Sequence, residues 1–377
     1  MSLRVGLITT LNTNIGDDFI RLGIRRVLEE LFEGQTVDYV AVNKHRPFSV
    51  YPRWHPLRWI QPLADVPRGR RAAERAMGSI DRTLHRFGNS RFDDVDLIVQ
   101  CGAPVMWPGC HESEWAVPLW EHVVGRIAAR IPVLNLAAGS AYPWEGEAVA
   151  SNSRDREFLT RISGYCRLTT VRDAHGEQIM RSLGVAAPLI PCSALLAPPD
   201  DRRGTTERDT VYVNYMTGGG HFAWDQDIDA DAWRNTVLDL VGRLGTRHKV
   251  AFLCHDETEN ELASGLDPRI PRVLPRSPDE YFAALGRAKA GIFNRLHAAV
   301  ALAGTGVPSV SIGTDTRMAM VAALDLPVTY VKDVSADLLE GQVEDLIARG
   351  DDERERLLGV RDATGKDYLN AIRDALD

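Results

Sequence analysis

The stretch GIFNRLHAAVALAG at residues 291–304, followed by GVPSVSIG at residues 306–313, has the pattern of a strand, a helix and a second strand. Arg295 and His297 follow the first apolar run, where a parallel α/β sheet opens the crevice that binds ligands. An arginine can hold a carboxylate or phosphate through two parallel bonds, and a histidine can move a proton near neutral pH. The stretch therefore predicts a site for an anionic substrate that undergoes acid or base chemistry.

A structural role is the alternative for the same two residues. Arg295 would then cap or pair at the helix start, and His297 would be a satisfied histidine beneath the next strand. The small apolar residues 298–304 favour the ligand site, because they let the helix start lie close to the sheet and to a ligand.

Outward from this stretch, apolar strands and amphipathic helices alternate along the whole chain, which is typical of parallel sheets with crossover helices. Strands are predicted at residues 5–10, 37–42, 96–100, 133–137, 168–171, 210–215, 250–254, 273–274, 291–294, 309–312 and 328–331. Helices are predicted at residues 17–32, 113–130, 155–165, 175–183, 231–244, 279–289, 335–349 and 351–375. The polar, proline-bearing stretch at 197–204 is typical of a domain linker.

Length and composition agree with two globular domains. The chain has 377 residues, more than a single core usually supports. Its net charge of -8 argues against non-specific nucleic-acid binding, which needs a basic surface. No apolar run approaches the roughly 20 residues of a membrane span, so we expect a cytoplasmic protein without a transmembrane segment. Five singly placed cysteines indicate neither a disulfide framework nor a zinc site, and no metal site is expected.

Further motifs follow other predicted strands. NIGDD at 14–18 offers Asn14 for hydrogen bonds, Gly16 for close backbone approach and Asp17 at a helix start, where an ordinary N-cap is the alternative. TGGGH at 217–221 brings Gly219, Gly220 and His221 after a strand, as an anion-binding or merely flexible loop.

Residues 44–91 carry eleven basic side chains against three acidic ones, with Trp54 and Trp59 among them. This excursion predicts either a docking surface for an anionic glycan, lipid-phosphate carrier or partner, or a solvated helical hairpin that covers the sheet edge.

In order and spacing, these motifs resemble the polysaccharide pyruvyltransferase family. The resemblance rests on NIGDD at 14–18, DLIVQCG at 96–102, VRD at 171–173, RLH at 295–297 and GTDTR at 313–317, where Arg317 stands at the usual lysine. It implies two Rossmann-like domains facing a cleft, as in glycosyltransferase-B enzymes, with an acceptor side at 1–197 and a donor side at 205–377. It also implies that the C-terminal helix crosses back onto the first domain.

The activity implied by the resemblance is the transfer of a pyruvyl group from phosphoenolpyruvate to saccharide hydroxyls, with no further cofactor. His297 would then be the acid or proton carrier, Asp17 the base, and Arg295 and Arg172 the clamps on the donor. The remaining substrate-binding candidates are Leu296, Arg317, Asn14, Gly16, Gly102, Gly219, Gly220 and His221.

Departures from the family pattern at CGAP (101–104) and PCS (191–193) indicate a divergent member. Two other functions stay open: a glycosyltransferase-like enzyme with a nucleotide-sugar donor, and a catalytically silent binding or scaffold protein. The acceptor is also open, as a cell-wall glycan, a lipid-linked saccharide or a small metabolite, and so is a homo-oligomer.

Overall fold

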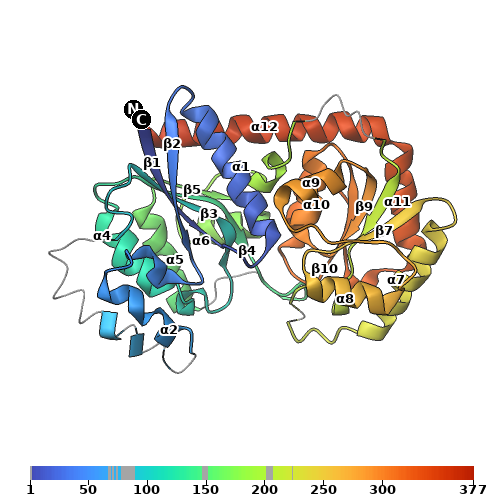
Figure 1. Ribbon diagram of the computed structural model, residues 1–377, viewed down its shortest axis with the longest axis horizontal. Helices are drawn as coiled ribbons and strands as arrows, with labels where there is room; N and C mark the ends of the chain where they lie inside the picture. The colour runs from blue at the N-terminus through green and yellow to red at the C-terminus, as the bar shows by residue number, and fades with distance from the viewer. Residues whose placement is uncertain are drawn as a thin grey trace.

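The computed structural model describes residues 2–66, 69, 72–73, 75–77, 90–146, 152–200, 207–222 and 224–377. Within them, two parallel β-sheets occupy the two halves of the molecule, each between helices (Figure 1). The predicted α/β fold with two Rossmann-like domains is confirmed.

The first sheet has the strand order β2-β1-β3-β4-β5. The interior strand β1 is buried on both faces at Val5, Leu7 and Ile8, as parallel sheets covered by helices require. Val5 lies opposite Leu97 of β3 on one side and Tyr39 of β2 on the other. The strands are β1 (Ser2–Thr9), β2 (Thr36–Asn43), β3 (Leu97–Met106), β4 (Val133–Ser140) and β5 (Leu168–Val171).

The second sheet has the order β11-β10-β9-β6-β7-β8, so β9 and β6 lie at its centre. Helix α10 (Leu296–Gly304) follows β9, and all of its residues except His297 are buried. The strands are β6 (Thr210–Val213), β7 (Lys249–Leu253), β8 (Arg272–Val273), β9 (Ala288–Phe293), β10 (Ser309–Gly313) and β11 (Val328–Tyr330).

Helices α1 (Ile15–Leu31), α9 (Pro278–Leu285) and α10 pack between the two halves, and α12 (Gly350–Leu376) contacts both α1 and α10. Phe19 of α1 lies 5.0 Å from the ring centroids of both Tyr281 and Phe282. Helix α12 runs back along both halves (Figure 1), and Tyr368 donates a hydrogen bond to the Pro191 carbonyl at 3.1 Å. One hydrophobic core is therefore continuous from the first half to the second.

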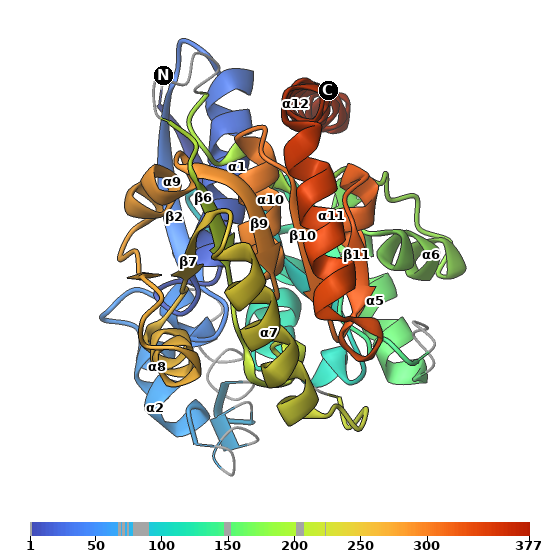
Figure 2. The ribbon, with the colours of Figure 1, turned by 90° about the vertical axis from the view of Figure 1, so that its right-hand side faces the viewer.

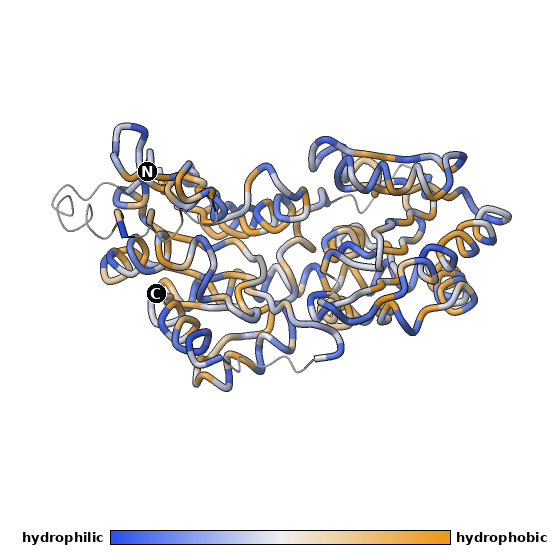
Figure 3. The backbone as a smooth tube through the Cα atoms, turned by 90° about the horizontal axis from the view of Figure 1, so that it is seen from below, coloured by the Kyte–Doolittle hydropathy of each residue, from blue (hydrophilic) through white to orange (hydrophobic). Residues whose placement is uncertain are grey.

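The other helices cover the outer faces of the sheets (Figure 2), and hydrophobic residues gather inside both halves (Figure 3). The α-helices are α2 (Gln61–Ala64), α4 (Gly125–Ile127), α5 (Ser153–Tyr165), α6 (Ala174–Ser182), α7 (Ala230–Leu244), α8 (Glu257–Leu266) and α11 (Ala336–Ala348). Residues Ala116–Val124 form a π-helix. The short 3-10 helices are Pro47–Val50, Pro56–Ile60, Cys110–Glu112, Ser193–Leu196, Thr217–Gly219, Met318–Leu324 and Val331–Asp333.

Two sequence predictions need correction. The helix predicted at 113–130 begins as a π-helix at Ala116, where the N–H of Trp120 donates to the carbonyl of Trp115, five residues back, at 3.3 Å. The helix predicted at 279–289 ends at Leu285, and β9 already begins at Ala288. The stretch predicted as a linker lies between β5 of the first sheet and β6 of the second. Its start is buried, and Arg361 donates to the Pro198 carbonyl at 2.7 Å, while residues 201–204 lie outside the described residues.

The basic excursion is described only in part, because residues 67, 68, 70, 71, 74 and 78–89 lie outside the described residues. Its described part is not a helical hairpin. Between Pro47 and Ala64 it forms short helices that bury Phe48, Val50 and Leu57 against the first domain. Trp54 and Trp59 are exposed.

Candidate active site

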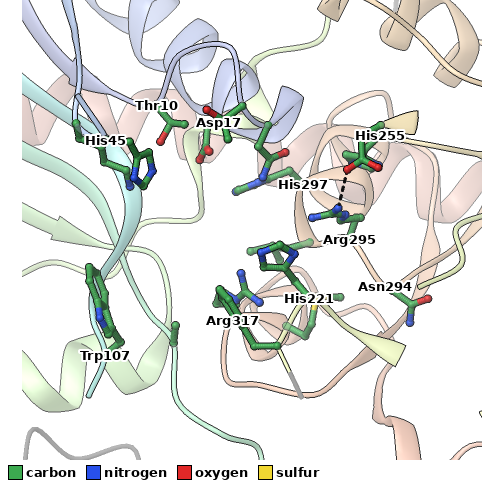
Figure 4. Close-up of a pocket in the computed structure, with 18 of the residues that line it drawn as sticks. Thr10, Asp17, His45, Trp107, His221, His255, Asn294, Arg295, His297 and Arg317 are labelled. Carbon is green, nitrogen blue, oxygen red and sulfur yellow. Dashed lines mark hydrogen bonds and ion pairs between the residues drawn. The ribbon is translucent and has the colours of Figure 1, made fainter. Parts of the chain in front are cut away.

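A cleft of about 610 Å³ lies between the two halves, a size typical of small-molecule sites. Side chains that follow the carboxyl ends of strands line it from both sheets, as the rule for open α/β folds requires. Figure 4 shows Asp17 and His45 on one side of the cleft, Arg295 on the other, and His297 between them. The predicted site residues that line it are Asn14, Asp17, Arg172, His221, Arg295, Leu296, His297 and Arg317.

Arg172 and His297 meet deep in the cleft. Arg172 follows β5, is 1% exposed, and its Nη1 donates to Nε2 of His297 at 3.2 Å. No carboxylate lies within ion-pair distance of Arg172 among the described residues; the neighbouring Asp173 accepts from Ser140 and Gly176 instead. Among the described residues, Arg172 is therefore a buried cation without an ion-paired carboxylate.

The imidazole of His297 is neutral near pH 7. Burial holds its pKa well below the ordinary value of 6.5, and the positive charge of Arg172 lowers it further. Because Nε2 accepts from Arg172, the single ring proton of the neutral imidazole sits on Nδ1. This tautomer points one N–H donor toward the start of α1.

Helix α1 begins at this point, and its N-cap is Asn14 rather than Asp17. The Asn14 side chain accepts from the backbone N–H of Gly16 at 2.9 Å. Asp17 is partly buried in the first turn and lines the cleft, and it accepts no hydrogen bond from a described side chain. The N-cap interpretation of Asp17 is thus wrong, and its carboxylate faces the cleft.

Replacing Gly16 by alanine is expected to destabilise the protein by about 1–3 kcal/mol. A Cβ at Gly16 would lie 2.5 Å from Nδ1 and 2.8 Å from Cβ of His297, so either α1 or α10 would have to shift. Urea unfolding measures the effect. Gly341→Ala in α11 is the matched control, because nothing lies within 4 Å of that position, and it is expected to be neutral or stabilising. Equal losses in both variants would contradict the close approach.

Arg295 lies in the opposite wall and is held by two carboxylates. Its Nε donates to Glu259 at 2.5 Å and its Nη2 to Asp256 at 3.3 Å. Burial raises the pKa of Glu259, but the hydrogen bond from His255 and the charge of Arg295 outweigh it and bring the pKa to about 2. The guanidinium charge of Arg295 is therefore largely compensated within the protein.

Arg317 is compensated in the same way. Its Nε and Nη2 donate to the two oxygens of Asp315 at 2.8 and 2.6 Å, and its guanidinium lies 4.7 Å over the Phe222 ring. His221 lies beside both arginines, and burial followed by the charge of Arg295 lowers its pKa. Of the three predicted arginine contacts, only Arg172 lacks a carboxylate partner among the described residues.

The glycines predicted to bind substrate require a correction. Gly102, Gly219 and Gly220 do not line the cleft. A Cβ there would lie 2.5 Å from Ile20, 2.2 Å from Val331 and 2.2 Å from Thr314, respectively, so these glycines allow close packing. From the TGGGH loop, it is His221 that reaches the cleft.

Sequence reasoning missed a group on the first-domain wall: Lys44, His45, Trp107 and Trp115. Lys44 directly follows β2, so the positional rule applied to Arg295 would have found it. No cysteine lines the cleft, and burial raises the pKa of Cys101 to about 12, which makes it unreactive.

The described residues hold no group of three or more histidine, cysteine or acidic side chains arranged as metal ligands. None of the helices described has the length and apolar character needed to cross a membrane.

The two facing parallel-sheet domains and the cleft between them define a glycosyltransferase-B-like fold. Similar structures are the UDP-GlcNAc 2-epimerase from Neisseria meningitidis bound to UDP-GlcNAc (TM-score 0.54, 11% identity, 99% of this chain and 100% of that chain) and S. aureus MnaA with UDP (0.52, 8%, 99% and 97%). The glycotransferase of kitacinnamycin is also similar (0.51, 12%, 99% and 97%). At these identities the likeness establishes the fold alone.

Within this class, the model of the family described as polysaccharide pyruvyl transferase matches residues 14–316, and the chain belongs to that family. The match confirms the resemblance found in the sequence. A comparison with curated proteins finds no significant match.

Proposed function

We propose that the protein transfers a pyruvyl group from phosphoenolpyruvate to two hydroxyls of a saccharide. The observation that carries this proposal is the pair formed by Arg172 and His297, a buried cation without a carboxylate partner beside a neutral imidazole. A dianionic or trianionic donor supplies the missing negative charge. Membership of the family supports the same reaction.

The reaction balances with two acceptor hydroxyls. One proton adds to the methylene carbon of phosphoenolpyruvate, and the oxygen of the first hydroxyl bonds to C2. The second hydroxyl then bonds to C2 as the bond from C2 to the phosphate oxygen breaks. Of the two hydroxyl protons, one replaces the proton consumed at the methylene and the other leaves with phosphate, so the products are a pyruvate ketal and inorganic phosphate.

The proposed roles follow from the cleft geometry. Arg172 binds the donor's negative charge, and His297, in contact with it, carries the proton between donor and solvent or phosphate. Asp17 on the facing helix accepts a hydroxyl proton from the acceptor. Arg295 and Arg317, fixed by their carboxylates, orient the donor and contribute directional N–H donors, with Leu296 as an apolar contact.

Binding of phosphoenolpyruvate is expected to raise the pKa of His297, so that the protein takes up a proton below about pH 6.5. Burial holds this pKa well below 6.5 and the charge of Arg172 lowers it further; an anion that binds Arg172 offsets the second effect and releases Nε2, the ring nitrogen that takes the proton. Calorimetry in two buffers of different ionisation enthalpy counts the protons. His297→Asn is the reference, since protons bound or released by phosphoenolpyruvate itself are counted in both proteins. Equal proton uptake by the native protein and the variant would contradict the role of His297 as proton carrier.

The function is tested first by calorimetric titration of phosphoenolpyruvate and, in parallel, of nucleoside diphosphates. Phosphoenolpyruvate binding supports the proposal. A nucleotide-sugar donor is the second candidate, because similar structures were solved with UDP-GlcNAc and UDP. Clear binding of one nucleoside diphosphate without binding of phosphoenolpyruvate would make that candidate the leading one. Release of phosphate from phosphoenolpyruvate in the presence of a saccharide acceptor would exclude a silent scaffold.

A further inference from the structure

Lys44 is a buried cation with no ion-pair partner among the described residues. It follows β2, is 4% exposed and lines the cleft. Its Nζ lies 4.8 Å from the centroid of the Trp115 ring, and the structure gives it no carboxylate within ion-pair distance. Burial lowers its pKa, an effect that the more distant Asp17 and Glu114 partly oppose. A lysine in this setting costs stability unless a ligand brings a negative charge to it.

Aromatic rings surround Lys44 on the same wall. Trp107 and Trp115 meet edge to face with centroids 5.3 Å apart, and His45 meets Trp115 at 5.4 Å. His45 is fixed by Glu114 at 2.5 Å, so it does not compete for the anion that Lys44 lacks. Trp115 is 7% exposed and lies beneath Lys44, whereas Trp107 is half-buried. The Trp107 ring therefore provides the apolar contact for a sugar, and Lys44, held over Trp115, is the charged group that fixes its orientation.

We propose that Lys44, Trp107 and Trp115 form the acceptor subsite, and that the acceptor is a saccharide bearing a phosphate or carboxylate group. The subsite lies on the first-domain wall with Asp17, whereas Arg295 and Arg317 lie across the cleft (Figure 4). The inference rests on the proposed function only in calling this ligand the acceptor. The donor's second anionic group is the other source of negative charge, and the experiment separates the two.

The test measures binding of hexose 1-phosphates, the corresponding uronic acids and the neutral methyl glycosides, by calorimetry and tryptophan fluorescence. The native protein is expected to prefer at least one charged sugar over its neutral counterpart by about tenfold or more. Lys44→Met is expected to remove this preference while binding of phosphoenolpyruvate changes by less than about twofold. Arg46→Met, which removes an exposed cation two residues away, is the matched control and is expected to keep the preference.

Two further variants keep the test decisive if Lys44→Met does not fold. Lys44→Arg retains the charge and is expected to retain the preference, whereas Trp107→Leu is expected to weaken charged and neutral sugars by the same factor. The inference is overturned if the native protein shows no preference for a charged sugar, or if Lys44→Met weakens phosphoenolpyruvate as strongly as the sugars. A Lys44-dependent preference in a protein that does not bind phosphoenolpyruvate would refute the proposed function and leave the anionic-saccharide subsite standing.

Discussion

Replacing Arg172 by methionine is expected to weaken the binding of phosphoenolpyruvate by about thirtyfold or more. The ligand then loses its contact with the one predicted arginine whose charge is not compensated by the protein. Removing one partner of a buried charge pair costs about 2–5 kcal/mol, and each 1.4 kcal/mol is a factor of about ten in Kd. Calorimetric titration of the native and variant proteins measures this loss.

In the absence of ligand, the Arg172→Met variant is expected to be as stable as the native protein, or more stable. A buried guanidinium that lacks a carboxylate partner is costly, so an apolar side chain of similar length removes a penalty. Arg317→Met is the comparison, because Asp315 matches the charge of Arg317 in the native protein. We expect Arg317→Met to weaken phosphoenolpyruvate binding less than Arg172→Met does. If Arg317→Met weakens phosphoenolpyruvate binding more than Arg172→Met does, the main anion-binding residue is Arg317 of the second domain.

Much of the fold followed from the sequence because its signals are local. The run LTTV at 168–171 is too short for a helix and rich in β-branched residues, and the structure has β5 at those residues. The amphipathic pattern that begins near Asp17 likewise became α1. The helix α8 (Glu257–Leu266) was missed although Asp256 and Glu259 have the spacing of a helix start, because its apolar residues are few and widely spaced.

The site was predicted in position more than in detail. Strand ends locate Arg295, His297 and Arg172, since the carboxyl ends of parallel strands share one edge of a sheet. The sequence does not say which arginine meets a carboxylate, because Glu259 approaches Arg295 only through the pairing of β6 with β7 and β9. Gly102, Gly219 and Gly220 were predicted to bind substrate for a similar reason. The sequence does not show the neighbouring side chains, so a glycine required for close packing cannot be distinguished from one that leaves room for a ligand.

Glu259→Gln is expected to lower the free energy of unfolding by about 1–3 kcal/mol, because an amide cannot accept from all the donors around this carboxylate, although Arg295 keeps its ion pair with Asp256. Glu259 is 2% exposed, bonds Arg295 at 2.5 Å and also accepts from Asn214 at 2.7 Å. The amide removes a negative charge that fixes Arg295, so weaker binding of phosphoenolpyruvate is expected as well. Urea unfolding measures stability, with Glu257→Gln as the matched control: that exposed residue of the same helix pairs with exposed Arg276, and no measurable change is expected.

The pH dependence of this loss separates the ion pair from simple repacking. The pKa of Glu259 is about 2 in the folded protein, against an ordinary value of 4.5 in the unfolded chain. Its stabilising contribution is therefore fully present above about pH 4.5 and is lost as the pH falls toward 2, because the unfolded chain then binds the proton more readily. The difference between native and Glu259→Gln should stay constant from pH 7 to about pH 5 and shrink below that. A difference that stays constant down to pH 3 would mean that the carboxylate charge does not hold Arg295 in the cleft.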